Sequence, residues 1–288
     1  MVTYEPEPER LQRALAAVRP QVSSVIVVDN GSRATPCIGT DDATLIRLPQ
    51  NLGVGAAQNA GIRAAQAQGA RFVLLLDQDS VPAPDMTRHL LDAHDRAERA
   101  GLAVGAVGAR VQGPDGHDDG FVRFRAGRYL AVPVGTEDEW IDCDMLIASG
   151  SLVPLASIER VGAMAEDLFI DKVDTEWCLR ARASGLRLLG APRALLHHRL
   201  GDGAVRIWFG RWRELRLHQP FRYYYMVRNG LLLRHSPHRT PAWCRADLRQ
   251  LLSIVLYFGL LKPRGFVPLR MMLRGLVDGL RQVSGPLR

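Results

Sequence analysis

Two carboxylates one residue apart form the sharpest chemical feature of the sequence. The apolar run Phe72–Leu76 predicts a strand buried on both faces, and Asp77-Gln78-Asp79 follows it directly. Two like charges side by side are unfavourable unless a cation accompanies them, and Mg²⁺ or Mn²⁺ suits such oxygen ligands. An Asx turn or a helix cap would explain a lone pair of this kind. The carboxyl end of a strand, where open α/β sheets bind ligands, favours the metal.

A second group of acids precedes a predicted helix. Asp171, Asp174 and Glu176 stand close together, and helical periodicity follows as far as Gly185. Acidic side chains are favoured at a helix N-terminus by its dipole, so capping alone could explain them. The functional alternative is a general base, which is one carboxylate held near an acceptor hydroxyl. The residues alone leave both interpretations open.

Polar side chains also follow two other apolar runs. Asp29 ends the run Ser24–Val28, and a carboxylate there could accept hydrogen bonds from a nucleotide base or ribose. The sequence Asp-Asn-Gly is also an ordinary turn. His197 and His198 follow Ala194–Leu196, and a lone histidine is more often structural than a ligand. In a chain with an Asp-x-Asp, the pair supplies a third candidate metal ligand.

The glycine spacing excludes two common nucleotide-binding loops. Asn51-Leu52-Gly53 and Asn59-Ala60-Gly61 surround a helix start, but no third glycine stands in register with Gly53 and Gly55. The pattern matches neither a Walker loop nor Gly-x-Gly-x-x-Gly. A mononucleotide kinase and a Rossmann dehydrogenase are therefore disfavoured.

Apolar runs alternate with helical stretches and predict an α/β fold. We expect strands at 24–28, 72–76 and 104–111, and helices at 53–68, from Pro84 to about Ala100, and at 174–184. The order β-α-β-α-β implies a mostly parallel sheet with helices on both faces. The turn-rich residues 112–145 predict a flexible insertion over the sheet edge, and 145–152 predict a strand that turns into a loop.

Composition sets the broad class of protein. The chain has 288 residues, of which 47% are hydrophobic and 23% charged, as in a packed globular protein. Its 4 cysteines are widely spaced without a Cys-x-x-Cys pair, which argues against a zinc module and fits a reducing compartment. No basic segment followed by an apolar run opens the chain, so no signal peptide is predicted.

Charge divides the chain into two unequal parts. Residues 1–179 carry 16 Lys and Arg against 26 Asp and Glu, whereas residues 180–288 carry 21 against 4. Such asymmetry points to an anionic partner of the second part, which could be nucleic acid, phosphate groups or a membrane surface. A nucleic-acid-binding protein would use Trp208, Trp212 and Tyr223–Tyr225 to stack bases, but no nucleic-acid module is recognisable.

The apolar run Leu251–Leu261 has two interpretations. It is too short to span a bilayer, which needs about 20 residues. With basic residues around it, an interfacial amphipathic region is as well supported as a buried helix. The first interpretation would place the region from about Arg206 onward on the membrane, with Trp208, Trp212 and Phe258 at the interface; the basic residues around the run are Arg249, Lys262, Arg264, Arg270 and Arg274.

Taken together, these motifs resemble the family 2 inverting glycosyltransferases of GT-A fold, in particular the rhamnosyltransferase-like branch that builds bacterial surface polysaccharides. The resemblance covers nearly the whole chain in the family's order. The matching segments are Val2-Thr3-Tyr4, Val28–Ser32, Asn51-Leu52-Gly53, Asn59-Ala60-Gly61, Leu76–Ser80, Ser149-Gly150-Ser151, Phe169–Trp177, His198–Asp202 and Arg222–Asn229.

The resemblance implies a role for each matched residue. Asp79, Asp77 and His198 would hold Mg²⁺ or Mn²⁺ on the donor diphosphate. Asp174 resembles the catalytic base, with Glu176 as a second acid near the acceptor. Binding of the nucleotide-sugar would involve Thr3, Tyr4, Asp29, Asn59, Asp77, Gln78, Gly150 and Ser151. In this branch Asp-Gln-Asp-Ser accompanies a dTDP-rhamnose donor, and a UDP-hexose on the same fold is the alternative.

The resemblance also implies an architecture and partners. We expect a GT-A catalytic domain over residues 1–205 and a basic helical extension over 206–288. A saccharide or lipid-linked acceptor is expected at the cytoplasmic membrane face, and nucleic acid is not. An inert membrane-associated scaffold is disfavoured because Asp77, Asp79 and Asp174 are retained.

The first strand departs from the family pattern. Members usually carry an apolar run before Val-Thr-Tyr, but here Met1 directly precedes Val2. We therefore expect either a start codon assigned too late or a weakened sheet, because the missing strand would leave neighbouring backbone groups unpaired. Glu5 also stands where Asn is common in the family, so the predicted contacts to the nucleotide base rest on a weaker match than the metal site does. Restoring about five to eight apolar residues before Val2 is predicted to raise both solubility and stability.

Overall fold

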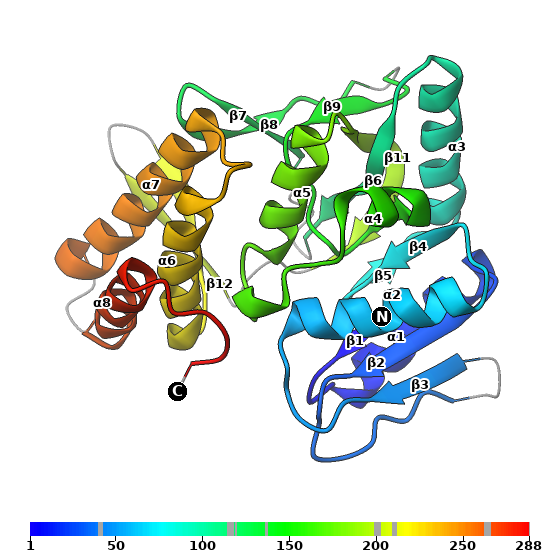
Figure 1. Cartoon of the computed structure of the whole chain (residues 1–288), viewed down its shortest axis with the longest axis horizontal. Coiled ribbons are helices and arrows are strands. Elements are labelled where there is room, and N and C mark those ends of the chain that lie inside the picture. Colours follow the sequence, from blue (N-terminus) through cyan, green and yellow to red (C-terminus); the bar gives the residue numbers. More distant parts are fainter. Residues whose placement is uncertain are drawn as a thin grey trace.

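The computed structural model describes residues 1–39, 43–113, 118, 120–135, 138–198, 203–208, 212–261 and 266–287, without the side chains of 203–216 and 260–261. Figure 1 shows an α/β part beside a group of three helices near the C-terminus. The sheet strands of the α/β part run through its middle, with helices on both faces. The three helices are α6 (Pro220–His235), α7 (Pro241–Leu256) and α8 (Phe266–Leu280).

Three parallel strands form one side of the sheet. They are β1 (Val2–Thr3), β2 (Val25–Asp29) and β3 (Ala43–Arg47). β1 is joined to the strand that precedes the Asp-x-Asp, because the Val2 amide donates to the Leu76 carbonyl at 3.1 Å. The Met1 ammonium donates to the Ile26 carbonyl at 2.7 Å. The ends of β1 and β2 therefore meet next to Asp77.

The other side of the sheet is mixed. Its order is β4-β10-β6-β11-β5, with β10 antiparallel to β4 and β6, and β11 parallel to β6. β9 pairs with β11 in addition. The bounds are β4 (Phe72–Leu75), β5 (Val81–Pro82), β6 (Val104–Gln112), β9 (Ile141–Cys143), β10 (Ser151–Pro154) and β11 (Arg187–His197). The predicted α/β class is confirmed, and so are the strands predicted at 24–28, 72–76 and 104–111, each to within one residue at either end.

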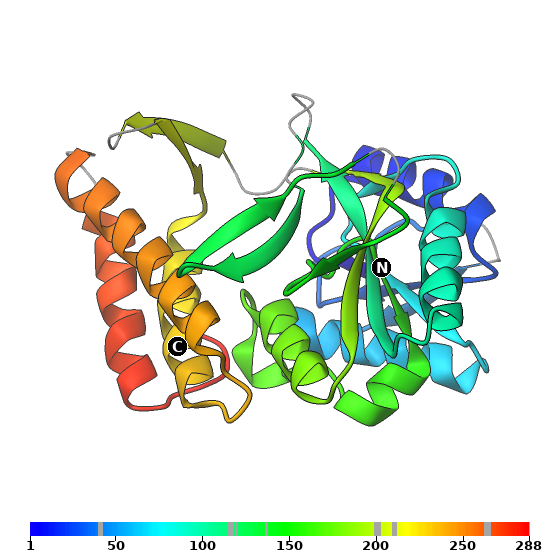
Figure 2. The same cartoon turned by 90° about the horizontal axis from the view of Figure 1, so that it is seen from above.

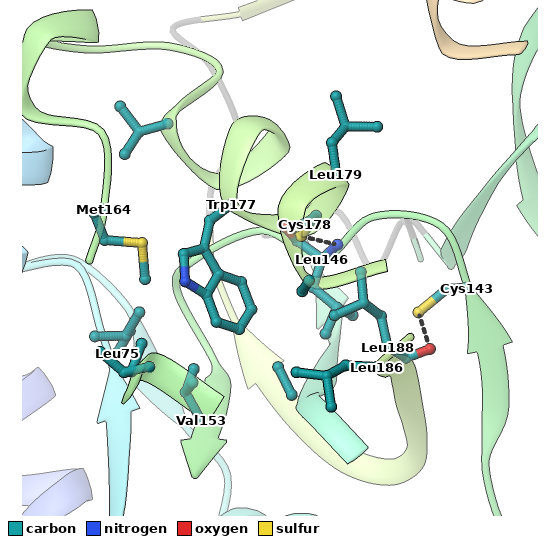
Figure 3. Packing of buried hydrophobic residues seen from close by; sticks show 14 of the residues in the cluster. Leu75, Cys143, Leu146, Val153, Met164, Trp177, Cys178, Leu179, Leu186 and Leu188 are labelled. Carbon is teal, nitrogen blue, oxygen red and sulfur yellow. Dashed lines mark hydrogen bonds between the residues drawn. The ribbon is translucent and has the colours of Figure 1, made fainter. Parts of the chain in front are cut away.

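Two apolar layers enclose this sheet. Helices α1 and α3 cover one face with side chains such as Leu15, Met86 and Leu90. The other face is packed around Trp177 of α5, whose indole nitrogen donates to the Gly162 carbonyl at 3.0 Å; Figure 3 shows this indole beside Met164. The helices are α1 (Pro8–Val18), α2 (Val54–Ala67), α3 (Met86–Arg99), α4 (Leu155–Val161) and α5 (Val173–Ala183).

Two predictions about the middle of the chain are wrong. Residues 112–145 do not form only a flexible insertion, because β7 (Phe121–Arg125) and β8 (Arg128–Val132) form a hairpin with Phe121 and Phe124 buried in the core. Residues 145–152 were expected to begin as a strand, but β10 starts only at Ser151, after a turn at Gly150. A smaller difference is that α3 begins at Met86, two residues after Pro84.

Helices α6 and α7 pack into the core of the α/β part. Leu233 of α6 and Trp243 of α7 belong to the same core cluster as Trp177. Figure 2 shows the β7–β8 hairpin reaching to α7, where Arg249 donates to the Gly127 carbonyl at 3.1 Å. A second hairpin, β12 (Gly203–Trp208) and β13 (Trp212–Leu217), precedes α6. The expected extension therefore shares its core with the domain on which it packs.

Tyr223–Tyr225 are buried, with exposed fractions of 1–2%. These tyrosines are therefore not available to stack bases, as the disfavoured nucleic-acid alternative would require. The run Leu251–Leu261 divides, because Leu251, Ile254 and Phe258 are buried while Leu252 and its neighbours Val255 and Leu256 are exposed. Phe258 is thus a core residue and does not belong to a surface. The side chains of Trp208 and Trp212, and all of Lys262 and Arg264, lie outside the described residues.

Candidate active site

Asp77, Asp79 and His198 converge at the edge where β4 and β11 end. The His198 Nδ1 atom lies 3.5 Å from an Asp79 oxygen, and its Nε2 atom lies 4.0 Å from an Asp77 oxygen. One ligand atom from each residue lies within 4.8 Å of the others. Only Gln78 separates two of these residues in sequence, and β11 brings the third from more than a hundred residues away. The predicted grouping of these three side chains is what the structure shows.

Two buried hydroxyls hold this cluster in place. The Asp77 amide donates to Ser149 Oγ at 3.1 Å, and Ser149 Oγ lies 2.6 Å from Ser80 Oγ. Ser80 Oγ in turn lies 2.9 Å from His198 Nδ1. A hydrogen bond at one imidazole nitrogen fixes the ring and leaves the other nitrogen, Nε2, for a metal.

The cluster fits a divalent cation. Two carboxylates and one imidazole are hard or borderline ligands suited to Mg²⁺ or Mn²⁺, with substrate oxygens filling the remaining positions. Burial raises the pKa of Asp77 above its ordinary value, and the nearby Asp79 charge raises it further, while His198 opposes the shift. An added cation would relieve the repulsion between the two carboxylates.

Thr3 and Asp29 form the neighbouring part of the edge. The buried Asp29 carboxylate accepts a hydrogen bond from Arg47 Nε at 3.2 Å, and the Thr3 hydroxyl lies 3.5 Å from its other oxygen. Tyr4 is 47% exposed, and its amide donates to the Gln78 side-chain oxygen at 2.8 Å. The residues predicted to bind the nucleotide base thus lie next to the Asp-x-Asp.

Three predicted donor-binding residues are engaged elsewhere. The Asn59 amide donates to the Met164 carbonyl at 2.9 Å and accepts from the Met164 amide at 2.9 Å, and Asn59 is only 2% exposed. The Ser151 hydroxyl donates to the Ile147 carbonyl at 2.6 Å. Gly150 is buried, and its amide donates to the Leu75 carbonyl. Each of these residues thus has a hydrogen-bond partner within the protein, and their role in donor binding stays a prediction.

Asp174 lies in the first turn of α5 and lines a small apolar cavity with Trp177 and Cys178. Burial raises the pKa of Asp174, while a hydrogen bond from the Thr175 amide at 2.7 Å and the positive charge of Lys172 oppose the shift. The charge of Asp77 also raises this pKa, so Asp174 lies close enough to the Asp77–Asp79–His198 cluster for their charges to interact. A carboxylate that is partly desolvated is a better proton acceptor than one in water.

Glu176 does not join Asp174. Residues two apart on a helix point in different directions, and the Glu176 carboxylate accepts hydrogen bonds from Arg180 at 2.7–2.9 Å. Arg180 also donates to the Val161 carbonyl at 2.6 Å. The structure therefore shows Glu176 in a contact that ties α5 to the preceding loop, and its predicted place near the acceptor stays a prediction.

Sequence comparisons agree with this geometry. A model of the family described as "Glycosyl transferase family 2" matches residues 1–134. The chain is also 31% identical over 248 residues to a curated protein of Shigella flexneri named "dTDP-rhamnosyl transferase RfbF", and the match covers 83% of this chain and 79% of that protein. The chain belongs to glycosyl transferase family 2.

Solved structures show that this family 2 chain has the GT-A fold. The Staphylococcus aureus TarS 1-349 structure in complex with UDP-GlcNAc has a TM-score of 0.54 at 15% identity, over 98% of this chain and 80% of that one. GalNAc-T7, solved with UDP, GalNAc and Mn²⁺, has a TM-score of 0.55 at 12% identity, over 91% of this chain. The chain spans 57% of the GalNAc-T7 structure.

The structure also shows contacts around the site that the sequence did not predict, by residues that lie within the matched segments. Ser149 and Ser80 support the metal cluster, and Arg222 binds Asp171 through two hydrogen bonds of 2.6 and 3.2 Å. The charge of Arg222 also lowers the pKa of Asp77, although burial and Asp79 outweigh it. Serine and arginine are common on any surface, so only the distances reveal these roles. Arg199, Gly201 and Asp202 of the matched segment lie outside the described residues.

Proposed function

We propose that this glycosyltransferase moves rhamnose from dTDP-rhamnose to a saccharide or lipid-linked acceptor in the synthesis of a bacterial surface polysaccharide. The observation that carries the proposal is the Asp77–Asp79–His198 cluster together with the half-buried carboxylate of Asp174, which lies near enough for the charge of Asp77 to raise its pKa. The similarity to the S. flexneri rhamnosyl transferase supports the choice of donor.

The residues divide the reaction between them. Asp77, Asp79 and His198 would hold Mg²⁺ or Mn²⁺, which when bound offsets the charge of the departing nucleotide diphosphate. Asp174 takes the proton from the acceptor hydroxyl as its oxygen attacks the anomeric carbon on the face opposite the diphosphate. The bond from the anomeric carbon to the diphosphate oxygen breaks, so the sugar inverts and no enzyme nucleophile is needed.

A donor panel tests the proposal. Purified protein with Mn²⁺ or Mg²⁺ is offered dTDP-rhamnose, UDP-GlcNAc and UDP-glucose, and slow donor hydrolysis is measured by release of the nucleotide diphosphate. We expect dTDP-rhamnose to be hydrolysed fastest, with loss of the signal in Asp79→Ala and in excess chelator. Preference for a UDP-hexose would support the alternative donor, which the TarS complex with UDP-GlcNAc makes a fair competitor.

We further propose that α7 and α8 bind the cytoplasmic face of the membrane peripherally. Apolar side chains on these two helices are unusually exposed, with Phe266 at 76%, Leu280 at 65%, Leu273 at 61% and Leu252 at 51%. Phe266, Leu273 and Leu280 recur every seven residues and so lie along one side of α8, and exposed apolar surface of this kind marks an interaction site. Within the described residues, none of the helices has the length and hydropathy needed to cross a bilayer.

Basic side chains interleave with this apolar surface. Arg270, Arg274 and Arg281 are exposed on α8 or directly after it, alongside Leu273 and Leu280. Each cation near an anionic leaflet contributes about 1 kcal/mol, so charge and apolar contact act together. A lipid-linked acceptor in that leaflet would then lie within reach of the bound enzyme.

Sedimentation with vesicles tests this contact. Binding to anionic vesicles at low salt is expected to weaken as salt rises, since exposed charges are screened. The triple variant Arg270→Gln, Arg274→Gln, Arg281→Gln is expected to bind less, whereas the matched triple variant Arg13→Gln, Arg88→Gln, Arg99→Gln on α1 and α3 is not. Equal binding of both variants would contradict the proposed surface.

A further inference from the structure

The segment that leads into α5 has an unusual backbone. Phe169, Asp171 and Lys172 all have positive φ angles of 61–65°, a conformation that side chains other than glycine rarely adopt. Asp174 follows two residues later. Such conformations persist only where the surroundings enforce them, and they gather at functional sites. The question is which side chains enforce this one.

One side-chain amide on α6 donates hydrogen bonds to the backbone carbonyls of this segment. Asn229 is fully buried, and its Nδ2 atom lies 3.0 Å from the Leu168 carbonyl oxygen and 2.8 Å from those of Ile170 and Asp171. The neighbouring Arg228 also donates to the Leu168 carbonyl at 3.0 Å. Backbone carbonyls that no strand or helix pairs thus find their donors on a helix some sixty residues away.

A buried ion pair fixes the last residue of the segment. Lys172 Nζ lies 2.5 Å from an oxygen of Asp247 on α7, and the other Asp247 oxygen accepts from Arg234 of α6 at 3.1 Å. Asp247 is fully buried, and the Lys172 side chain is 9% exposed. Removing one partner of such a pair leaves the other charge buried without compensation, which is strongly unfavourable. The pair therefore stabilises this conformation.

We propose that Asn229, Lys172 and Asp247 are positioning residues, which hold the segment Leu168–Lys172 in this backbone and thereby aim Asp174 at the acceptor hydroxyl. The proposal rests on the function of Asp174 proposed above. It makes α6 and α7 part of the catalytic machinery, in addition to any contact with a membrane. Figure 1 shows α5 lying between these helices and the sheet.

Lys172 also acts through its charge. The Lys172 ammonium lowers the pKa of Asp174, against burial and the like charges of Asp171 and Asp77. Burial raises the pKa of Tyr129 on β8 and of Cys178 on α5, and the nearby charge of Asp174 raises both further. Since the burial of Lys172 is outweighed by Asp247, the pKa of Lys172 lies above its ordinary value and the ammonium stays charged.

The experiment compares Asn229→Ala, Asp247→Asn, Lys172→Met and Lys172→Arg with the control Tyr224→Phe. Tyr224 is equally buried on α6 but donates to Asp278 of α8 at 2.8 Å, away from the segment. We expect kcat to fall about 10- to 100-fold in the first three variants, since a displacement of about 1 Å can cost that much. The affinity of these variants for dTDP with Mn²⁺ should stay within about threefold of that of the unaltered enzyme. Lys172→Arg keeps the positive charge and should retain much of the rate.

Two further measurements separate positioning from general damage. The acidic limb of the kcat profile should move to higher pH in Lys172→Met, because the charge that lowers the pKa of Asp174 is gone. Amide hydrogen exchange should speed up over residues 168–176 in Asn229→Ala, but stay unchanged over α2 and in Tyr224→Phe.

The outcomes distinguish this inference from the proposed function. Full kcat in Asn229→Ala and Asp247→Asn, or equal losses of nucleotide affinity and kcat, would overturn it. If the unaltered enzyme transferred another sugar, only the proposed donor would fail, and the variants would be compared with that sugar. If it transferred no sugar, unchanged exchange over 168–176 in Asn229→Ala would still overturn the inference.

Discussion

The Asp77–Asp79–His198 cluster and the segment Leu168–Lys172, which precedes Asp174, are assembled in different ways. Asp77 and Asp79 come just after β4, so the end of one strand supplies two of the three ligands, which Ser149 and Ser80 help to hold. The segment before Asp174 has no such support and depends on Asn229 and Asp247 from distant helices. A site can thus be locally encoded in one half and built by long-range contacts in the other.

This difference has a consequence for mutation. Substitutions at the strand end should remove chemistry and leave the fold intact, because Asp77 and Asp79 are partly exposed and hold little else. Substitutions in the helices should change the position of Asp174 and also cost stability. Removing one member of a buried ion pair typically costs about 3 to 5 kcal/mol.

The largest effect is expected at Asp79. Asp79→Ala should lower the turnover by about 10³- to 10⁴-fold, since a bound cation contributes several kcal/mol to leaving-group stabilisation. Turnover and Mn²⁺ affinity are measured together. The control is Asp95→Asn, which alters an exposed carboxylate of the His94–Asp95–Glu98 group on α3. Full activity of Asp79→Ala in excess chelator would show that this strand end holds no catalytic metal.

A smaller effect is expected at Ser149. Ser149→Ala removes the hydroxyl that joins the Asp77 amide to Ser80 and, through it, to His198. Loss of such outer contacts typically lowers metal affinity 10- to 100-fold, so the Mn²⁺ requirement should rise by about that factor. The melting temperature serves as the control for folding. An unchanged metal requirement would mean that His198 is oriented by other contacts.

The pH dependence of kcat tests the environment of Asp174. Burial raises its pKa above the ordinary value of 3.8, and only the ionised form accepts a proton. The rate should therefore be full above the raised pKa and fall about tenfold per pH unit below it. Saturating donor and metal keep the titration of Asp77 out of the measurement. A limb at the ordinary value would show that Asp174 is solvated in the working enzyme.

The smallest effect on catalysis is expected at Glu176. Glu176→Gln weakens the contact with Arg180, so the free energy of unfolding should fall by about 1 to 3 kcal/mol while kcat changes little. Denaturant unfolding and initial rates measure the two quantities on one preparation. A loss of kcat as large as that in Asp174→Asn, at unchanged stability, would show that Glu176 takes part in the reaction.

The sequence predicted the parts of the site that follow strands. Asp77, Asp79, Asp29 and His198 each come directly after an apolar run, and parallel topology brings such ends to one edge. The acids of the α5 segment were visible too, but helix capping explained them equally well. The structure adds burial, which a sequence pattern cannot give for a single polar residue.

Other residues carried no signal of the contacts they make, although Asn229 ends the matched segment Arg222–Asn229. Asn229 and Asp247 lie within helices, and their partners are about sixty and seventy-five residues away in sequence. Asn59 resembled a donor-binding residue because of its place in a motif, yet its amide holds the Met164 backbone. The β7–β8 hairpin was missed because its many turn residues hid Phe121 and Phe124, which fill the core.

The most direct test of the account is a calorimetric titration of dTDP with Mn²⁺ into Asp174→Asn and Asp79→Asn, paired with single-turnover transfer. The account predicts that Asp174→Asn binds the nucleotide and metal like the unaltered enzyme but transfers about 10²- to 10⁴-fold more slowly. Asp79→Asn should lose both binding and transfer. Loss of nucleotide binding in Asp174→Asn, with normal turnover of the donor that still binds, would contradict the division of roles between base and metal.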